Sequence, residues 1–395
     1  MTPIAPLALA VAAAVLTIAL AVPRRTERHR ASPGGAASHP AAGTVAAVAV
    51  AFLAACGGDG GDGAQQAAGE AGAEAAGADS VVDVYSHRHY PSDQELYDRF
   101  TEETGIEVNV VTGSADQLIT RLATEGEGTP ADVLITVDAG RLHRARSQGL
   151  LQPVSSDTLE ARVPEHLRHP EGYWYGLTRR SRIIAYARDR VSEDELPTYE
   201  ELADDRWEGE ILVRSSENVY NQSLLASLVA HHGEEAAREW AQGVVDNMAR
   251  APQGGDTDQV MGVAAGVGDV AIVNHYYVAR LKTSDDPEEQ RVGEAVGVHF
   301  PNQDGRGAHV NVSGAGVTAA ADDPEAAVRL LEFLTSPDAQ RMFAQATKEF
   351  PVNPEVEPTG LLQSWAGFRA DTLNLSVLGE QNDRAVRIFG QVGWQ

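Results

Sequence analysis

From Ser80 onward, apolar and polar positions follow a pattern of short strands alternating with amphipathic helices. Val81–Ser86 and Ile106–Val111 are rich in β-branched residues, which is typical of strands. Between them, Ser92 and Glu95 have the spacing of a capping box, so a helix is predicted to open there. Further predicted elements are a helix opened by Ser114-x-x-Gln117, a strand at Val133–Thr136 and a helix near Gly140–Gln148. This alternation predicts a largely parallel α/β sheet.

The same pattern continues through the rest of the chain. Strands are expected at Ile183–Tyr186, Ile211–Val213, Val270–Val273 and Val296–Phe300. Helices are expected after Thr198-x-x-Glu201, between Asn221 and Asn247, and at Pro324–Leu334 and Asp338–Gln345. Two similar α/β lobes in one chain predict a ligand cleft between them.

The first 79 residues differ in composition from the rest. A basic segment precedes the apolar stretch 44–55, which ends Leu-Ala-Ala before Cys56, and this order resembles a lipoprotein signal peptide. Residues 1–55 are therefore interpreted as an export-signal region, and Cys56 as the residue that receives lipid. Residues 56–79 are mostly Gly, Ala, Asp, Glu and Gln, so they are expected to form a flexible tether. Met1–Val22 is a second apolar run, either an N-terminal extension or a stretch upstream of the true translation start.

Composition limits the classes of function. A chain of 395 residues is long enough for two domains plus non-globular sequence. Its formal net charge of -26 repels phosphate backbones, so nucleic-acid binding is not expected. The single cysteine excludes an internal disulfide.

Candidate ligand residues follow several predicted strands. His89 and Tyr90 come after the first strand, Tyr220 follows Ile211–Val213, and Tyr276 and Tyr277 follow Val270–Val273. Each alone is equally compatible with surface or packing roles. Open α/β sheets build sites at the carboxyl ends of strands, so together these residues indicate a site. Because adjacent side chains on a strand face opposite ways, the last two tyrosines could converge on one ion only from a turn or a helix start.

Four tyrosines and one histidine suit a hard, trivalent cation. Phenolate is a strong anionic oxygen donor once a metal displaces the proton from a group whose free pKa is about 10. Soft metals would need thiolates, and Cys56 lies outside the predicted fold. No His-x-x-x-His or paired-cysteine spacing indicates structural zinc. Ferric iron, Fe(3+), is the best match.

The chain resembles the ferric-ion-binding proteins of bacterial ABC importers from about Val81 to about Pro354. The pieces that carry this resemblance are VYSHRHYPSDQELYDRF, TEGEGTPADVLITVDAGRLHRA, WYGLTRRSRIIAYAR, RSSENVYNQSLLASL, GDVAIVNHYYVARL and VNVSGAGVTAAADDPEAAVRLLEFLTSPDAQ. The resemblance implies a two-lobe periplasmic-binding-protein fold of type II that closes over one iron ion. It implies lobes of 80–176 with about 300–352, and of 177–299 with about 353–395.

The resemblance also implies roles for individual residues. The residues that the resemblance matches to the family's metal ligands are His89, Tyr90, Tyr220, Tyr276 and Tyr277. Relatives that use a glutamate ligand carry it where this chain has Val137, so the version with one histidine and four tyrosines is expected. Four phenolates and a neutral histidine leave a ferric centre with one negative charge, which requires a compensating cation. Arg180 is the preferred candidate for this compensating cation, with Arg182 in reserve. The alternative role of the two arginines is to bind a small synergistic anion such as carbonate.

The expected protein is therefore a lipid-anchored, extracytoplasmic monomer that delivers iron to an ABC permease and its ATPase. One alternative is a binding protein of the same fold for a small organic solute. Another is a secreted metal-dependent enzyme, but the chain has neither a Gly-x-Ser-x-Gly elbow nor a His-Glu-x-x-His motif, the nearest sequence being Asn311-Val312-Ser313-Gly314-Ala315-Gly316. We therefore expect a protein that is not an enzyme.

Overall fold

The structure, a computed structural model, describes residues 80–395. A mixed β-sheet runs through this part of the chain. Its path is β2-β1-β3-β8-β4-β6-β5, and β7 and β9 both pair with β4. The strands are β1 (Val81–Ser86), β2 (Glu107–Thr112), β3 (Val133–Thr136), β4 (Tyr175–Ala187), β5 (Ile211–Leu212), β6 (Val270–Asn274), β7 (Val296–His299), β8 (Val310–Val317) and β9 (Phe350–Pro351).

Strand β4 belongs to both halves of this sheet. Residues 175–181 pair with β8, whereas residues 182–186 pair with β6, so the exchange of partners falls between Ser181 and Arg182. We call the part around β1, β2, β3, β8 and β9 the first half-sheet, and the part around β5, β6 and β7 the second half-sheet. The lobe boundaries given above stay a prediction.

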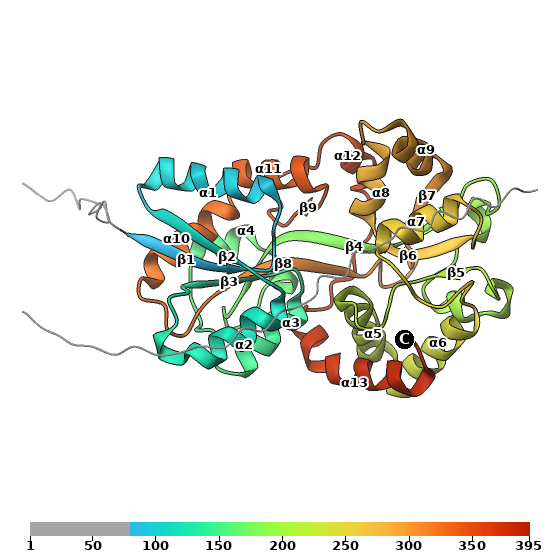
Figure 1. The fold of residues 1–395 in the computed structure, drawn as a ribbon, viewed down its shortest axis with the longest axis horizontal. Helices are drawn as coiled ribbons and strands as arrows, with labels where there is room; N and C mark the ends of the chain where they lie inside the picture. The colour runs from blue at the N-terminus through green and yellow to red at the C-terminus, as the bar shows by residue number, and fades with distance from the viewer. Residues whose placement is uncertain (1–79) are drawn as a thin grey trace, which may run out of the picture. The chain divides into compact units, whose positions relative to one another are not determined.

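Helices cover both faces of each half-sheet (Figure 1). In the first half, α1, α10 and α11 contact one another on one face, and α2 and α3 cover the other. In the second half, α7, α8 and α9 pack on one face, and α5 and α6 on the other. The helices are α1 (Pro91–Thr104), α2 (Ala115–Glu125), α3 (Ala139–Ser147), α4 (Asp157–Arg162), α5 (Val219–His232), α6 (Glu234–Asp246), α7 (Asp256–Ala264), α8 (His275–Lys282), α9 (Pro287–Ala295), α10 (Pro324–Leu334), α11 (Pro337–Thr347), α12 (Leu361–Trp365) and α13 (Ser376–Val392).

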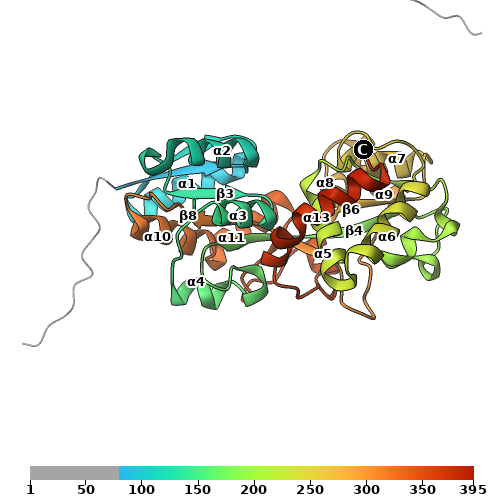
Figure 2. The ribbon, with the colours of Figure 1, turned by 90° about the horizontal axis from the view of Figure 1, so that it is seen from below.

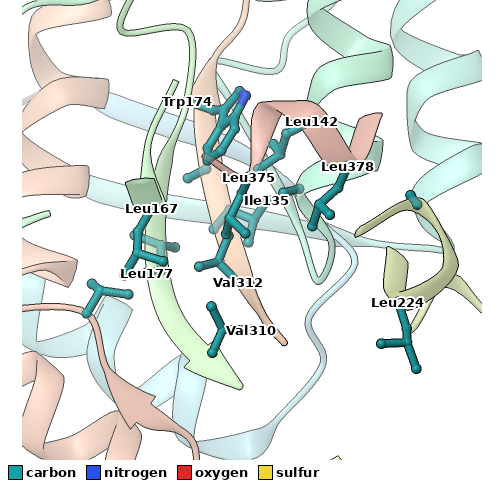
Figure 3. Packing of buried hydrophobic residues seen from close by; sticks show 14 of the residues in the cluster. Ile135, Leu142, Leu167, Trp174, Leu177, Leu224, Val310, Val312, Leu375 and Leu378 are labelled. Carbon is teal, nitrogen blue, oxygen red and sulfur yellow. The ribbon is translucent and has the colours of Figure 1, made fainter. Parts of the chain in front are cut away.

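The last helix, α13, joins the two halves. It packs on α5 and α6 of the second half and on α3 of the first, and Figure 2 shows it running across both. Leu378 of α13 and Leu142 of α3 belong to one buried cluster with Val312 of β8 (Figure 3). Burial of such side chains contributes about 1.5–3 kcal/mol each, so α13 is part of the core.

Three sequence expectations require correction. The sheet is not largely parallel, because β8 and β4 run antiparallel to the strands beside them as the chain crosses between halves. Helix α1 begins at Pro91 with Tyr90 as its N-cap, so the Ser92 capping box does not form; a proline at the first helical position sets the start instead. The pair Thr198 and Glu201 does hydrogen-bond, but it opens only one 3-10 turn, Glu200–Ala203.

Candidate metal centre

A cleft of about 350 Å³ lies between residues of both halves. Four of the five predicted ligands line it, while Tyr276 lies behind Tyr220. The lining residues are His87, Arg88, His89, Tyr90, Val137, Arg214, Glu217, Asn218, Val219, Tyr220, Tyr277 and Arg280.

The first half contributes the loop between β1 and α1. The His87 backbone N–H donates to the Ile135 carbonyl at 2.9 Å, which ties the loop to β3. His89 is exposed, its Nδ1 lies 3.3 Å from the His87 carbonyl oxygen, and its ring stacks on Tyr90 with 5.7 Å between ring centres. The loop thus presents an imidazole and a phenol side by side.

The second half contributes tyrosines from two helix starts. Asn218 caps α5 by accepting a hydrogen bond from the Tyr220 backbone N–H at 3.1 Å. Tyr276 and Tyr277 stand in the first turn of α8, directly after β6, and their ring centres are 4.4 Å apart. The Tyr276 hydroxyl donates to that of Tyr220 at 3.2 Å. Both tyrosines thus stand at a helix start, one of the two placements from which adjacent side chains could converge on one ion.

Burial favours the protonated form of these three phenols. Burial raises the pKa of Tyr220, Tyr276 and Tyr277 above the ordinary value, and the neighbouring tyrosines add to the rise for Tyr276. The positive charge of Arg180 acts in the opposite direction on Tyr220 without cancelling the effect of burial. A cation that binds here must therefore displace protons.

Arg180 lies close to the tyrosines but already has a counterion. Its guanidinium carbon is 5.5 Å from the Tyr220 ring centre, and its Nη2 is 2.8 Å from Glu349 Oε1. Arg88 pairs with the same carboxylate at 3.0 Å and with Asp93 at 3.0 Å. Burial alone would raise the pKa of Glu349, but the two arginines hold it at about 2. Two positive and two negative charges balance in this network.

Arg182 stands on the second half with its own counterion. Arg182 and Arg214 both contact the fully buried carboxylate of Asp256, whose second oxygen is 2.6 Å from Arg214. The guanidinium carbon of Arg182 is 5.8 Å from the Tyr220 ring centre. Two arginines share one carboxylate here, which leaves one positive charge in excess.

Arg280 is a cation of the cleft that the sequence reasoning missed. Its guanidinium carbon is 4.9 Å from the Tyr276 ring centre and 5.1 Å from that of Tyr90. Within residues 80–395 no carboxylate lies within 4 Å of it. Position 280 is four residues after Tyr276, one helical turn on, so the helix period was the signal that could have found it. Five arginines thus stand around the cleft, namely Arg88, Arg180, Arg182, Arg214 and Arg280. They face the three carboxylates that they pair with and Glu217, which also lines the cleft, so the excess is one positive charge.

Other classes of site are not seen in the described part of the chain. No group of three His, Cys, Asp or Glu side chains is placed to hold a metal there. None of its helices is long and apolar enough to span a bilayer. Ser313, the residue nearest to a nucleophile elbow, is buried in β8 and accepts a hydrogen bond from Arg88 at 2.9 Å. Cys56, the predicted lipidation site, lies outside the described residues.

The fold agrees with that of known proteins. Residues 128–364 match the family model of bacterial extracellular solute-binding proteins, so the chain belongs to that family. The predicted resemblance is confirmed, and so is the expectation of a protein that is not an enzyme.

Within this family, the similar proteins are iron uptake and ferric iron-binding proteins. The chain is 49% identical to iron uptake protein A1 of Synechocystis, over 82% of this chain and 90% of that protein. It is 28% identical to the major ferric iron-binding protein of Neisseria meningitidis, over 79% and 92%. A solved structure of Trichodesmium FutA (IdiA) in complex with iron and citrate ligands matches with a TM-score of 0.78 and 49% identity, covering 80% of this chain and all of that chain. These likenesses confirm the predicted type II fold.

Proposed function

We propose that this protein binds ferric iron outside the cytoplasm and delivers it to an ABC importer. The observation that carries the proposal is the convergence of Tyr90, Tyr220 and Tyr277 from two half-sheets on one cleft, with Tyr276 behind and His89 at the edge. Phenolate oxygens are hard anionic donors, which suit a trivalent ion. The ferric iron-binding proteins among the relatives support the same assignment.

The charges of the cleft support the binding of an anionic iron centre. Ferric iron with four phenolates and a neutral imidazole carries one negative charge. The five arginines around the cleft exceed its four carboxylates by one positive charge, which matches that negative charge, and Arg280 faces Tyr90 and Tyr276 directly. A desolvated anion is stable only beside such cations. A small synergistic anion such as carbonate is proposed as a further ligand, with Arg180 as its preferred partner and Arg182 in reserve.

The visible spectrum of iron-loaded protein tests this function. Tyrosinate-to-iron charge transfer absorbs visible light, so the purified chain titrated with ferric nitrilotriacetate should turn coloured and hold one iron per chain. Gallium(III), which has the same charge and no such transition, should compete without colour. A chain that takes up no iron, or that holds iron without any visible band, would contradict the proposal.

We further propose that the protein is a monomer held at the outer face of a membrane by lipid on Cys56, where it meets the permease. The Leu-Ala-Ala-Cys stretch and the Gly- and Ala-rich segment after it support this. Wild-type protein should partition into detergent, and Cys56→Ser should stay in the aqueous phase. A wild-type protein whose mature N-terminus is another residue and carries no lipid would contradict the anchor but leave iron binding intact.

A further inference from the structure

The two helices that carry tyrosines in the second half begin with the same spacing of residues. An asparagine stands at the N-cap and a tyrosine two residues later, as Asn218 and Tyr220 in α5 and as Asn274 and Tyr276 in α8. Asparagine is favoured at an N-cap because its side-chain oxygen accepts a hydrogen bond from a backbone N–H of the first turn. Asn218 does so, since it accepts from the Tyr220 N–H at 3.1 Å. Asn274 makes no such capping bond.

The side chain of Asn274 contacts a tyrosine hydroxyl instead. Its Nδ2 donates to the Tyr276 hydroxyl oxygen at 3.3 Å, and that hydroxyl donates in turn to the Tyr220 hydroxyl at 3.2 Å. An amide NH2 group can only donate, so Tyr276 accepts from it and turns its own proton toward Tyr220. The two bonds form a directed chain from Asn274 to Tyr220, which lines the cleft.

The surroundings of Asn274 fix both its backbone and its amide group. The residue is fully buried, and its backbone N–H donates to Asp256 Oδ1 at 2.9 Å. Its side-chain oxygen has no hydrogen-bond partner among residues 80–395, and the residue lines a small cavity together with Arg180 and Arg182. The positive charge of two guanidinium groups favours the orientation that brings the amide oxygen nearer to them. That orientation turns the NH2 group to Tyr276.

This contact suits a tyrosine that binds a metal ion. A phenolate oxygen carries a negative charge, and a hydrogen bond to a charged acceptor is stronger than one between neutral groups. The ion takes the place of the proton that Tyr276 directs toward Tyr220, while the bond from Asn274 remains on another lone pair of the oxygen. Asn274 therefore does not compete with the ion, and it fixes the direction in which the Tyr276 oxygen faces.

We propose that Asn274 is a positioning residue for iron binding, which rests on the proposed function because Asn274 acts only through Tyr276 as a ligand. Its amide holds the Tyr276 oxygen toward Tyr220 before the ion arrives and stabilises the phenolate afterwards. Helix α8 gives up its side-chain cap for this contact.

The variant Asn274→Leu tests this role, because leucine has a similar size but no amide. In the iron-loaded full chain, loss of the donated bond leaves the Tyr276 phenolate more electron-rich, so the tyrosinate-to-iron band should move to longer wavelength. Iron affinity, measured by competition with citrate, should fall about 10- to 100-fold.

The matched control is Asn247→Leu. Asn247 is also buried in the second half, and its Nδ2 donates to the Leu202 and Asp204 carbonyls at 3.0 and 2.8 Å, but it does not line the cleft. The control should lose stability, because it too loses buried hydrogen bonds, yet it should keep the wavelength of the band and the iron affinity. This difference separates positioning of a ligand from support of the fold.

A second measurement needs no variant. Gallium(III) replaces ferric iron without paramagnetism, and nitrogen-15 in asparagine reports each side-chain NH2 group by NMR. When gallium binds to the full chain, the Asn274 NH2 signal, identified by its contacts with Tyr276, should move downfield, because its hydrogen bond then ends on a phenolate. The Asn247 signal should not move.

Two results would overturn the role of Asn274 while a coloured wild type leaves the proposed function standing. One is an unmoved Asn274 signal in the gallium-loaded chain, and the other is an unchanged band and affinity in Asn274→Leu. A wild type that stays colourless with ferric iron would overturn the proposed function and the role of Asn274 together.

Discussion

The buried hydroxyl of Tyr276 is the least accessible donor of the cleft, yet it touches the most partners. It bonds to Tyr220, its ring lies 4.4 Å from that of Tyr277, and Arg280 covers it at 4.9 Å. Replacing it by phenylalanine keeps the packing and removes only the oxygen.

Tyr276→Phe should therefore shift or bleach the ferric band and weaken iron binding by at least about tenfold, equivalent to about 1.4 kcal/mol. Tyr277→Phe should act alike. The control is Tyr173→Phe, because Tyr173 is half-buried against His169 and Arg146, away from the cleft. Absorption titrations against citrate give both readouts. A coloured complex unchanged by Phe at 90, 220, 276 and 277 in turn would remove the tyrosines from the site.

Arg280 is expected to stabilise the bound state through charge. Arg280→Gln should weaken iron binding about 10- to 100-fold, and Arg280→Lys should recover part of the loss. Arg329, an exposed arginine of α10, provides the control. Competition titrations measure the affinities, and equal affinity in Arg280→Gln and wild type would show that other cations carry the compensation.

The sequence located most of the candidate site but not its charges. Tyrosines after strands are visible as a pattern, because the fold places strand ends at the cleft. The pairing of Arg180 with Glu349 was not visible, since 169 residues separate them along the chain. Long-range ion pairs of this kind leave no local pattern, so Arg88 and Arg214, which share the carboxylates of Glu349 and Asp256, were not predicted.

At the scale of elements, β8 is a long strand that the sequence pattern did not predict. Its sequence VNVSGAGV contains two glycines and a serine, which weaken a strand pattern. The structure explains them: a Cβ on Gly316 would lie 2.6 Å from the Tyr173 carbonyl oxygen, and one on Gly314 would lie 2.8 Å from that of Tyr175. The strands β1, β3 and β6 were predicted because they are rich in β-branched residues and contain no glycine.

Glu349 connects several elements through its ion pairs. It follows α11, and it contacts Arg88 of the loop before α1 and Arg180 of β4 while its side chain is 1% exposed. Glu349→Gln should lower the free energy of unfolding by about 3–5 kcal/mol, because two buried arginines lose their shared counterion. Glu355→Gln, at an exposed position nearby, should change it by less than about 0.5 kcal/mol. Urea denaturation measures both, and similar midpoints for the two variants would contradict this role.

At the scale of the whole molecule, acid should weaken the fold. His309, beside the point where β4 changes partner, is fully buried, and burial lowers its pKa to about 3, with Arg182 and Arg306 adding to the effect. In the unfolded chain His309 takes up a proton near pH 6.5, whereas in the folded chain it does so only near pH 3. Between these two pH values unfolding therefore takes up a proton, and the free energy of unfolding decreases as the pH decreases. At pH 5 the loss is about 2 kcal/mol.

His309→Gln should flatten the decline of unfolding free energy between pH 7 and 5, measured by urea denaturation at each pH. Part of the decline should remain, because burial also lowers the pKa of His275 to about 3. A slope identical to that of wild type would show that His309 does not titrate with unfolding.

Iron should also change the arrangement of the halves. The proposed ligands come from both halves, so the ion is expected to bind most strongly where the halves approach and to shift the population toward that state. Solution scattering should give a smaller radius of gyration with iron than without. Tyr90→Phe removes the first-half phenolate and should reduce the change, whereas Tyr173→Phe should not. An unchanged radius in the wild type would contradict closure.

The first half-sheet is not one continuous piece of chain. The first half is complete only when β8, far down the chain, inserts between β3 and β4, and α13 covers both halves only at the very end. During synthesis, β3 therefore keeps an unpaired edge until most of the protein has emerged, and such edges invite aggregation. The molecule cannot be divided into two separately expressed domains, and a chain cut before α13 leaves apolar surface open on both halves.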